Sequence, residues 1–233
     1  NRFAYGNAAY QQSLSDTWNL RGGFSYSRNE NNVKVDGAPA SEREQGYHIK
    51  AVTEHSLNES VEIRLGAEHI NRNYLASRLE VSTQQMQSLP FHEPLTGMFA
   101  EGEWYATTRW VTRAGMRTEY NALTGRWSVD PRWSVAYKPS NKGQFSFAYG
   151  TFRQSPVNSL LRVDKQLAPE RAEHFILNYQ VLTDRKTFRV EAFFKKYRDL
   201  VKYENANPMT LSNHGNGYAQ GIEVFWRDNQ TIR

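Results

Sequence analysis

Histidine, glutamate and serine are among the residues of this chain whose side chains could support catalysis. The six histidines are dispersed, none of them lies in a His-Glu-x-x-His frame, and no Gly-x-Ser-x-Gly elbow occurs. The adjacent pairs Glu54-His55 and Glu68-His69 would point to opposite faces of a strand and could not act on one substrate. The sequence therefore predicts a protein that is not an enzyme and needs no cofactor. An esterase or protease on this scaffold would require side chains from several strands to converge.

Apolar and charged residues alternate along several segments of the chain, so that the charged side chains fall at every second position. In residues 61–68 the odd positions are Val, Ile, Leu and Ala, whereas the even positions are Glu, Arg, Gly and Glu. The same period of two, which is the period of a β-strand, returns near 18–27, 110–119 and 188–195. The sequence therefore predicts strands with one apolar and one charged face. The residues expected to share the apolar face are Leu20, Phe24, Ile63, Leu65, Phe145, Phe147, Val190 and Phe194, with Arg64, Arg117 and Glu191 on the other face.

The predicted strands are long for a soluble protein. Most of them alternate over about ten residues, whereas strands of soluble sheets average about five or six. Ten residues match a tilted strand that crosses a bilayer, and the chain has no run of ~18 apolar residues that could cross as a helix. The predicted strands lie at about 2–13, 17–30, 45–57, 60–73, 97–106, 109–121, 131–138, 143–153, 170–181, 187–198 and 218–228.

Tight turns and long links alternate along the chain. Short turns, such as the one at 58–59, join strands into hairpins, and long polar links separate the hairpins. Short turns at one rim and long loops at the other are typical of an outer-membrane barrel, with periplasmic turns and extracellular loops. Near the short turns lie Trp18, Trp104, Trp110 and Trp226, as expected of indole rings at headgroup level. The long links are predicted at about 31–44, 74–96, 122–130, 154–169 and 199–217.

Composition narrows the possible partners. The 233-residue chain has a net charge of +5 and no cysteine, so it has no disulfide framework and no thiolate metal site. Its basic residues are spread along the predicted strands without a basic run, and nucleic acid is therefore not an expected partner. The predicted strands are odd in number, whereas single-chain bacterial barrels have even numbers. We therefore expect residues 1–233 to be a fragment of a single β-barrel domain.

Four segments of the C-terminal half carry a family resemblance. They read YGTFRQSP at 149–156, LAPERAEH at 167–174, EAFFKKYRDLV at 191–201 and NHGNGYAQGIE at 213–223. In order and spacing they resemble the barrel of TonB-dependent outer-membrane receptors, specifically over about 131–228 and more loosely over 1–130. Pro169 lacks a backbone donor and suits the entrance of a strand, and the glycines of 213–221 suit a bulge.

The resemblance implies an all-β, antiparallel up-and-down meander in the cell outer membrane, with a plug domain and coupling to the TonB complex. It implies energy-coupled uptake of a scarce external ligand, such as a siderophore, vitamin, oligosaccharide or peptide, by a protein in contact with membrane lipid and lipopolysaccharide. The chain shows no signal peptide, TonB box or plug domain, and no final strand that ends in an aromatic residue. We therefore expect the plug and the terminal strands to lie outside it. A passive or adhesive outer-membrane barrel and a soluble β-sheet ligand-binding module are the alternatives.

Two groups of site residues follow from the resemblance. Members of the family hold the plug through inward carboxylates of the wall. The resemblance therefore implies plug contacts at the candidates Glu101, Glu191 and Glu223. The alternative is that these carboxylates pair with arginines of neighbouring strands. The links 74–96 and 199–217 are expected to meet the external ligand, since loops on a rigid scaffold carry binding residues. The ligand candidates are Met86, Phe91, His92, Asn205, Asn207 and His214.

Overall fold

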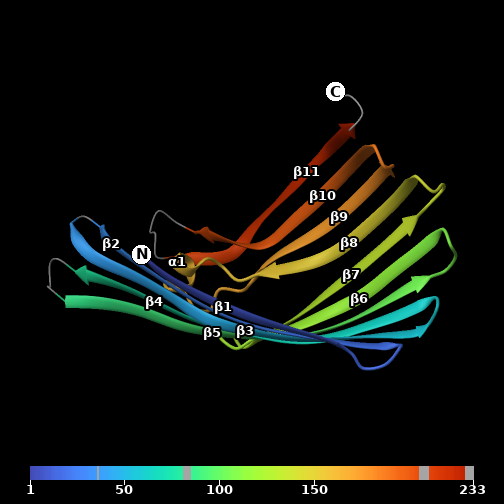
Figure 1. The fold of residues 1–233 in the computed structure, drawn as a ribbon. Helices are drawn as coiled ribbons and strands as arrows, with labels where there is room; N and C mark the ends of the chain where they lie inside the picture. Colours follow the sequence, from blue (N-terminus) through green and yellow to red (C-terminus); the bar gives the residue numbers. More distant parts are fainter. Residues whose placement is uncertain (36, 81–84, 205–209, 229–233) are drawn as a thin grey trace.

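The computed structural model describes residues 1–35, 37–80, 85–204 and 210–228. Within these residues the chain forms one 11-stranded sheet, in which consecutive strands pair in sequence order (Figure 1). Every pair is antiparallel, which confirms the predicted meander. The strands are β1 (Arg2–Ser13), β2 (Trp18–Val35), β3 (Ala38–Asn58), β4 (Val61–Glu80), β5 (Gln85–Tyr105), β6 (Trp110–Asn121), β7 (Arg126–Tyr137), β8 (Gly143–Gln154), β9 (Glu170–Leu182), β10 (Lys186–Tyr203) and β11 (Leu211–Asp228).

The two faces of the sheet differ in chemistry as the alternation predicts. Residues opposite each other in a ladder share a face, and Leu20 is opposite Thr53, which is opposite Leu65. Following the partners from β2 to β11 places all eight predicted apolar residues on one face and Arg64, Arg117 and Glu191 on the other. The face prediction is therefore confirmed. We call the apolar face the outward face and the charged face the inner face.

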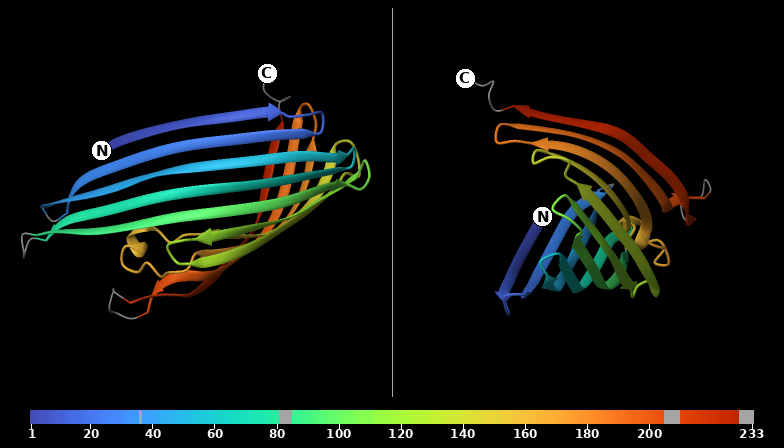
Figure 2. Two further views of the ribbon diagram at one scale, coloured as in Figure 1. Left: turned by 90° about the horizontal axis from the view of Figure 1, so that it is seen from below. Right: turned by 90° about the vertical axis from the view of Figure 1, so that its right-hand side faces the viewer.

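The sheet curves strongly around its inner face and stays open between β1 and β11 (Figures 1 and 2). The short helix α1 (Asn158–Leu161) lies on this concave side. None of the described parts of the chain forms a helix long and apolar enough to cross a bilayer. On the outward face large apolar side chains lie in the open, and Leu177 and Trp226 are 56% and 72% exposed. Such a continuous apolar surface is what hydrocarbon covers in an outer-membrane barrel.

Several strands run further than their sequence predicts. The predicted links 31–44 and 74–96 are wrong over most of their length, because the β2–β3 ladder reaches Val35 and Ala38 and the β4–β5 ladder reaches Glu80 and Gln85. The link 199–217 is likewise shorter, since Tyr203 pairs with Leu211, and β7 begins at 126 rather than 131. In these stretches the regular alternation of apolar and charged residues stops, as in Tyr74-Leu75-Ala76-Ser77, and their sequence by itself therefore favours loops. Backbone hydrogen bonds between strands do not require apolar side chains.

The link between β8 and β9 folds inward and forms the only buried cluster of apolar side chains among the described residues. We call residues 155–169 the roof segment. Its Leu161 is 0% exposed and its Leu167 is 3% exposed, and both pack against Tyr74 and Phe91 on the inner face of β4 and β5. The sequence predicted this link as an external loop and did not predict its inward packing. As predicted, Pro169 stands immediately before a strand, β9.

An arginine on the outward face should prevent assembly in the membrane. For a Leu177→Arg variant of the full-length protein we expect a cost of about 2–4 kcal/mol near mid-membrane and a clear loss of folded barrel. The neighbouring Ile176 lies on the inner face, because its partner Ala148 does, so Ile176→Arg is the matched control and should assemble. The heat-modifiable gel band of the folded barrel in outer-membrane fractions measures both. Equal loss in the two variants would contradict the face assignment.

Candidate functional site

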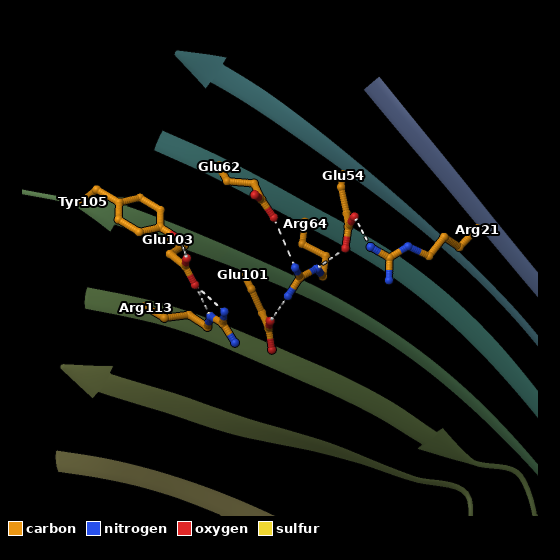
Figure 3. A network of polar contacts seen from close by, with 8 residues as sticks. All are labelled: Arg21, Glu54, Glu62, Arg64, Glu101, Glu103, Tyr105 and Arg113. Carbon is orange, nitrogen blue, oxygen red and sulfur yellow. Dashed lines mark hydrogen bonds and ion pairs between the residues drawn. The ribbon is translucent and has the colours of Figure 1, made fainter. Parts of the chain in front are cut away.

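Ion pairs link adjacent strands across the inner face from β2 to β6 (Figure 3). Arg64 lies at the centre: its Nε donates to Glu54 at 2.8 Å, and its Nη atoms lie 3.1 Å from Glu62 and 3.5 Å from Glu101. Arg21 shares Glu54, with Nη2 2.5 Å from Oε2. These pairs form because the ladder registers place the charges opposite or diagonal to one another on one face, with Glu54 opposite Arg64 and Arg64 opposite Glu101.

A second set of pairs centres on Glu68 at the loop side of this network. Glu68 Oε1 lies 2.5 Å from Arg117 Nη1, while its Oε2 accepts from His48 at 3.1 Å and lies 3.7 Å from Lys50. Arg117 also reaches Glu119 at 2.5 Å. The two sets line one hollow of about 710 Å³. Carboxylates held by arginines in this way make a wetted, polar wall and supply no free nucleophile or general base.

The three nominated plug contacts differ in their surroundings. Glu101 faces Arg64 across the ladder, so the alternative of cross-strand pairing describes it. Glu191 and Glu223 are directly opposite each other on β10 and β11, and Glu191 accepts a 3.4 Å hydrogen bond from Asn178. Among the described residues neither carboxylate has a lysine or arginine within salt-bridge distance. Like charges directly opposite each other destabilise a ladder, so this pair differs from Glu54 and Glu101, which have an arginine partner in the wall.

The roof segment is tied to the inner face by a buried carboxylate. Glu93 is 1% exposed and pairs with Arg72; it also accepts from Asn121 Nδ2 at 2.8 Å and from Ser155 Oγ of the roof segment at 2.5 Å. A second tie joins Asn158 Nδ2 to Glu44 at 3.1 Å. Sequence reasoning missed this site, because its members are distant in the chain and Ser155 carries no signal beyond its position after a strand.

Tyr74 forms the floor under the roof segment. Its ring stacks on Phe91 at 5.0 Å between centroids, and its hydroxyl donates to Glu42 at 3.0 Å. Burial, with the nearby Glu42, raises the pKa of Tyr74 to about 12. The hydroxyl therefore stays a neutral donor at every physiological pH.

The ligand candidates do not lie in loops where the structure describes them. Met86, Phe91 and His92 belong to β5, and His214 belongs to β11. Phe91 is a correction: it is 5% exposed in the cluster under the roof segment and has no free surface for a ligand. Met86 and His92 lie on the outward face, because they are at even positions of β5, as are Met98 and Ala100 of that face. His214 is exposed and its Nδ1 lies 3.0 Å from Glu204. Asn205 and Asn207 lie outside the described residues.

Asn213 is a positioning residue that the sequence did not single out. Its Nδ2 donates to the carbonyls of Asp199 at 2.8 Å and Ala168 at 3.0 Å, and its Oδ1 accepts from the Ala168 amide at 2.8 Å. It thereby joins β11 to the end of the roof segment and to a bulge in β10, where Asp199 has φ 58°. The predicted bulge of the glycine-rich segment is confirmed, since the β10–β11 register shifts on both sides of the pair of Leu200 and Gly215.

An open antiparallel sheet with an apolar outward face, a charged inner face and tight turns at one rim defines part of the wall of a membrane-spanning β-barrel. The family model for the TonB dependent receptor-like beta-barrel matches residues 1–231. The chain therefore belongs to this family of outer-membrane receptors and transporters. A search of curated proteins finds no match.

Solved structures of the family share the fold at low sequence identity. The FrpB iron transporter from Neisseria meningitidis (F3-3 variant) superposes with a TM-score of 0.75 at 14% identity, covering 95% of this chain and 40% of that one. The siderophore receptor PirA from Acinetobacter baumannii gives 0.74 at 12%, covering 98% and 42%. The RagAB peptide transporter gives 0.72 at 11%, covering 95% and 33%. The chain thus spans roughly two fifths or less of the length of these structures.

Proposed function

We propose that this chain is part of the wall of a receptor that imports a scarce external ligand with energy delivered by the TonB complex, and that a plug domain seats against its inner face. Family membership supports the proposal. The neighbouring structures are described as an iron transporter, a siderophore receptor and a peptide transporter, so a siderophore or another metal chelate, a vitamin, an oligosaccharide or a peptide are the ligand classes to test.

The Glu191–Glu223 pair is the observation that carries the plug part of the proposal. From β2 to β6 the inner carboxylates have arginine partners within the wall, whereas these two have none among the described residues. A basic side chain of the plug, placed between them, would relieve their repulsion. Glu101, paired with Arg64, would contribute less.

The external ligand would enter beside the roof segment. A hollow of about 500 Å³ opens there, lined mostly by polar side chains of β6, β7, β8, β10 and β11 together with Ala168 and Pro169 of the roof segment. Arg126, Asn213 and His214 are among its lining residues, which keeps His214 as a ligand candidate. Met86 and His92 are weaker ligand candidates, because their side chains lie on the outward face of the wall.

Dependence on TonB tests the uptake proposal directly. Cells that express the full-length receptor should accumulate one of a panel of radiolabelled probes, namely ferric catecholates, ferric hydroxamates, cobalamin, an oligosaccharide and oligopeptides, only when TonB is present. Uptake that is equal without TonB would favour a passive barrel.

Removing the unpaired carboxylates should loosen the plug. In the full-length receptor we expect Glu191→Gln with Glu223→Gln to raise sensitivity to vancomycin, a bulky antibiotic that a seated plug excludes, by several-fold (about one lost charge-assisted contact, roughly 1.5–3 kcal/mol). Glu59→Gln, an exposed carboxylate at the β3–β4 turn, is the matched control and should have no effect. Wild-type sensitivity in the double variant would argue against a plug contact at this pair.

A further inference from the structure

Three arginines occupy positions next to one carboxylate on the outward face of β1, β2 and β3, and two of them form ion pairs with it. Glu30 of β2 is opposite Arg2 of β1 and opposite Arg43 of β3. Arg43 Nη2 lies 3.4 Å from Glu30 Oε2, and Arg28 Nη2 donates to the same oxygen at 3.2 Å. Three cations and one anion leave this cluster with an excess of two positive charges.

The arginine cluster lies on the outward face of the sheet, where the other side chains are mostly apolar and charged side chains are unexpected. Glu30 and Arg28 share the face of Leu20 and Phe24, because all four are at even positions of β2. The β2–β3 register runs without a shift from Trp18 to Val35, so this face is the apolar outward face throughout. The side chains of Arg28 and Arg43 are each 44% exposed. They therefore face the surroundings of the wall and neither the lumen nor the roof segment.

The height of the cluster matches the outer edge of the hydrocarbon. Trp18 lies at the short-turn end of β2, and Arg28 and Glu30 follow it by ten and twelve residues. At about 3.3 Å per residue and a tilt of about 45°, they lie roughly 23–28 Å above it, whereas the apolar band of such barrels is about 25 Å tall.

Amphipathic rings mark the same boundary just below the arginines. Tyr26 is opposite Tyr47 on the outward face, and the Tyr47 ring lies 5.9 Å from the ring of His69 on the next strand. Rings with an apolar body and a polar tip sit at the membrane interface. At the level of the arginines, the outward positions Gln45, Asn71 and Asn73 on β3 and β4 are uncharged. The positive charge is therefore local to β1, β2 and the facing part of β3.

We propose that the Arg2–Arg28–Arg43 cluster binds the phosphate groups of a phosphorylated glycolipid in the outer leaflet. Guanidinium groups bind phosphate oxygens through paired, charge-assisted hydrogen bonds, and several of them at one site suit a head group with more than one phosphate. Glu30 pairs with Arg28 and Arg43 and therefore competes with the phosphate groups for these two arginines. The tyrosine row lies where the head group of such a lipid meets its acyl chains.

Native mass spectrometry of the full-length receptor in detergent, titrated with diphosphoryl lipid A, tests the proposal. Arg28→Gln with Arg43→Gln should weaken lipid A binding at least about tenfold, the factor that corresponds to ~1.4 kcal/mol, and Glu30→Gln should strengthen it. Monophosphoryl lipid A should bind the wild type more weakly, and phosphatidylcholine should not compete. The control is Arg126→Gln, which removes one positive charge at the lumen side of the same end and should leave binding unchanged.

Three results would overturn the proposal. They are wild-type affinity in the double variant, an equal loss in Arg126→Gln, and phosphatidylglycerol binding as tightly as lipid A, since the last would show a general anionic surface. If the double variant does not fold, as judged by heat-modifiable mobility, Arg2→Gln takes its place, because it leaves both Glu30 ion pairs intact. It should weaken lipid A binding about threefold to tenfold, and unchanged binding would count against the site.

Discussion

Replacing Arg72 with methionine in the full-length receptor is expected to destabilise the loop end of the wall by about 3–5 kcal/mol. Glu93 is 1% exposed, and Arg72 is its only cationic partner among the described residues. Without the guanidinium the carboxylate would keep only the neutral donors Asn121 and Ser155 in a site that water does not reach. An uncompensated buried charge is among the most costly single changes in a protein.

A double variant separates the lost charge from lost packing. Arg72→Met combined with Glu93→Gln removes both charges and should recover most of the stability lost by Arg72→Met alone. Arg113→Met is the control, because its pair with Glu103 is half exposed on the arginine side and should be worth less than about 1 kcal/mol. Urea unfolding in lipid bilayers, followed by tryptophan fluorescence, measures all of these variants. A loss for Arg72→Met no larger than for Arg113→Met would refute the buried-charge explanation.

Truncation of Leu161 is expected to release the roof segment. Leu161 is fully buried against Tyr74, Phe91 and Leu167, so Leu161→Ala should cost about 2–5 kcal/mol of the local packing free energy. The roof segment forms no strand of the sheet, so the loss should appear as local opening and leave the strands of the wall paired.

Trypsin digestion of the receptor in outer-membrane vesicles reports this opening. Lys165 lies at the tip of the roof segment, where the Gln166 amide donates to Asp164 and holds the backbone in a turn. We expect Leu161→Ala to speed cleavage at this lysine by about tenfold or more, following the open population. Val163→Ala changes a side chain that is 42% exposed and should cleave at the wild-type rate. Equal rates for Leu161→Ala and the wild type would show that Leu161 does not hold the segment.

Local pattern was sufficient to predict the strands, the hairpins and the two faces. Leu65 and Arg64 are neighbours in sequence and lie on opposite faces because successive side chains of a strand alternate, a property of the backbone alone. The tight turns and the tryptophans near them were also readable, because both follow from residue type at a fixed place beside a strand. Membership of the receptor family was predictable for the same reason, since its motifs lie on contiguous segments.

Strand ends and the inward-folded roof segment were decided only by the tertiary structure. Residues 74–80 and 85–96 lack a regular alternation of apolar and polar side chains and were therefore interpreted as a loop, yet each strand finds its hydrogen-bond partners on the other and the ladder continues. Ser155 and Glu93 are separated by 62 residues, and nothing in either local pattern indicates that they meet. Pairing partners were equally hidden: Glu101 lies opposite Arg64, whereas Glu191 lies opposite Glu223.

One physical cause separates the features that the sequence determined from those that only the tertiary structure decided. The side-chain period of a strand is fixed by covalent geometry and is written in consecutive residues, so the sequence by itself determined which face each residue occupies. Register, the length of a ladder and the packing of a link across the sheet depend on contacts between residues far apart in the chain, and one residue of slip would change every pair. The placement of Arg2 and Arg43 opposite Glu30 is such a consequence of register, and only the paired sheet reveals it.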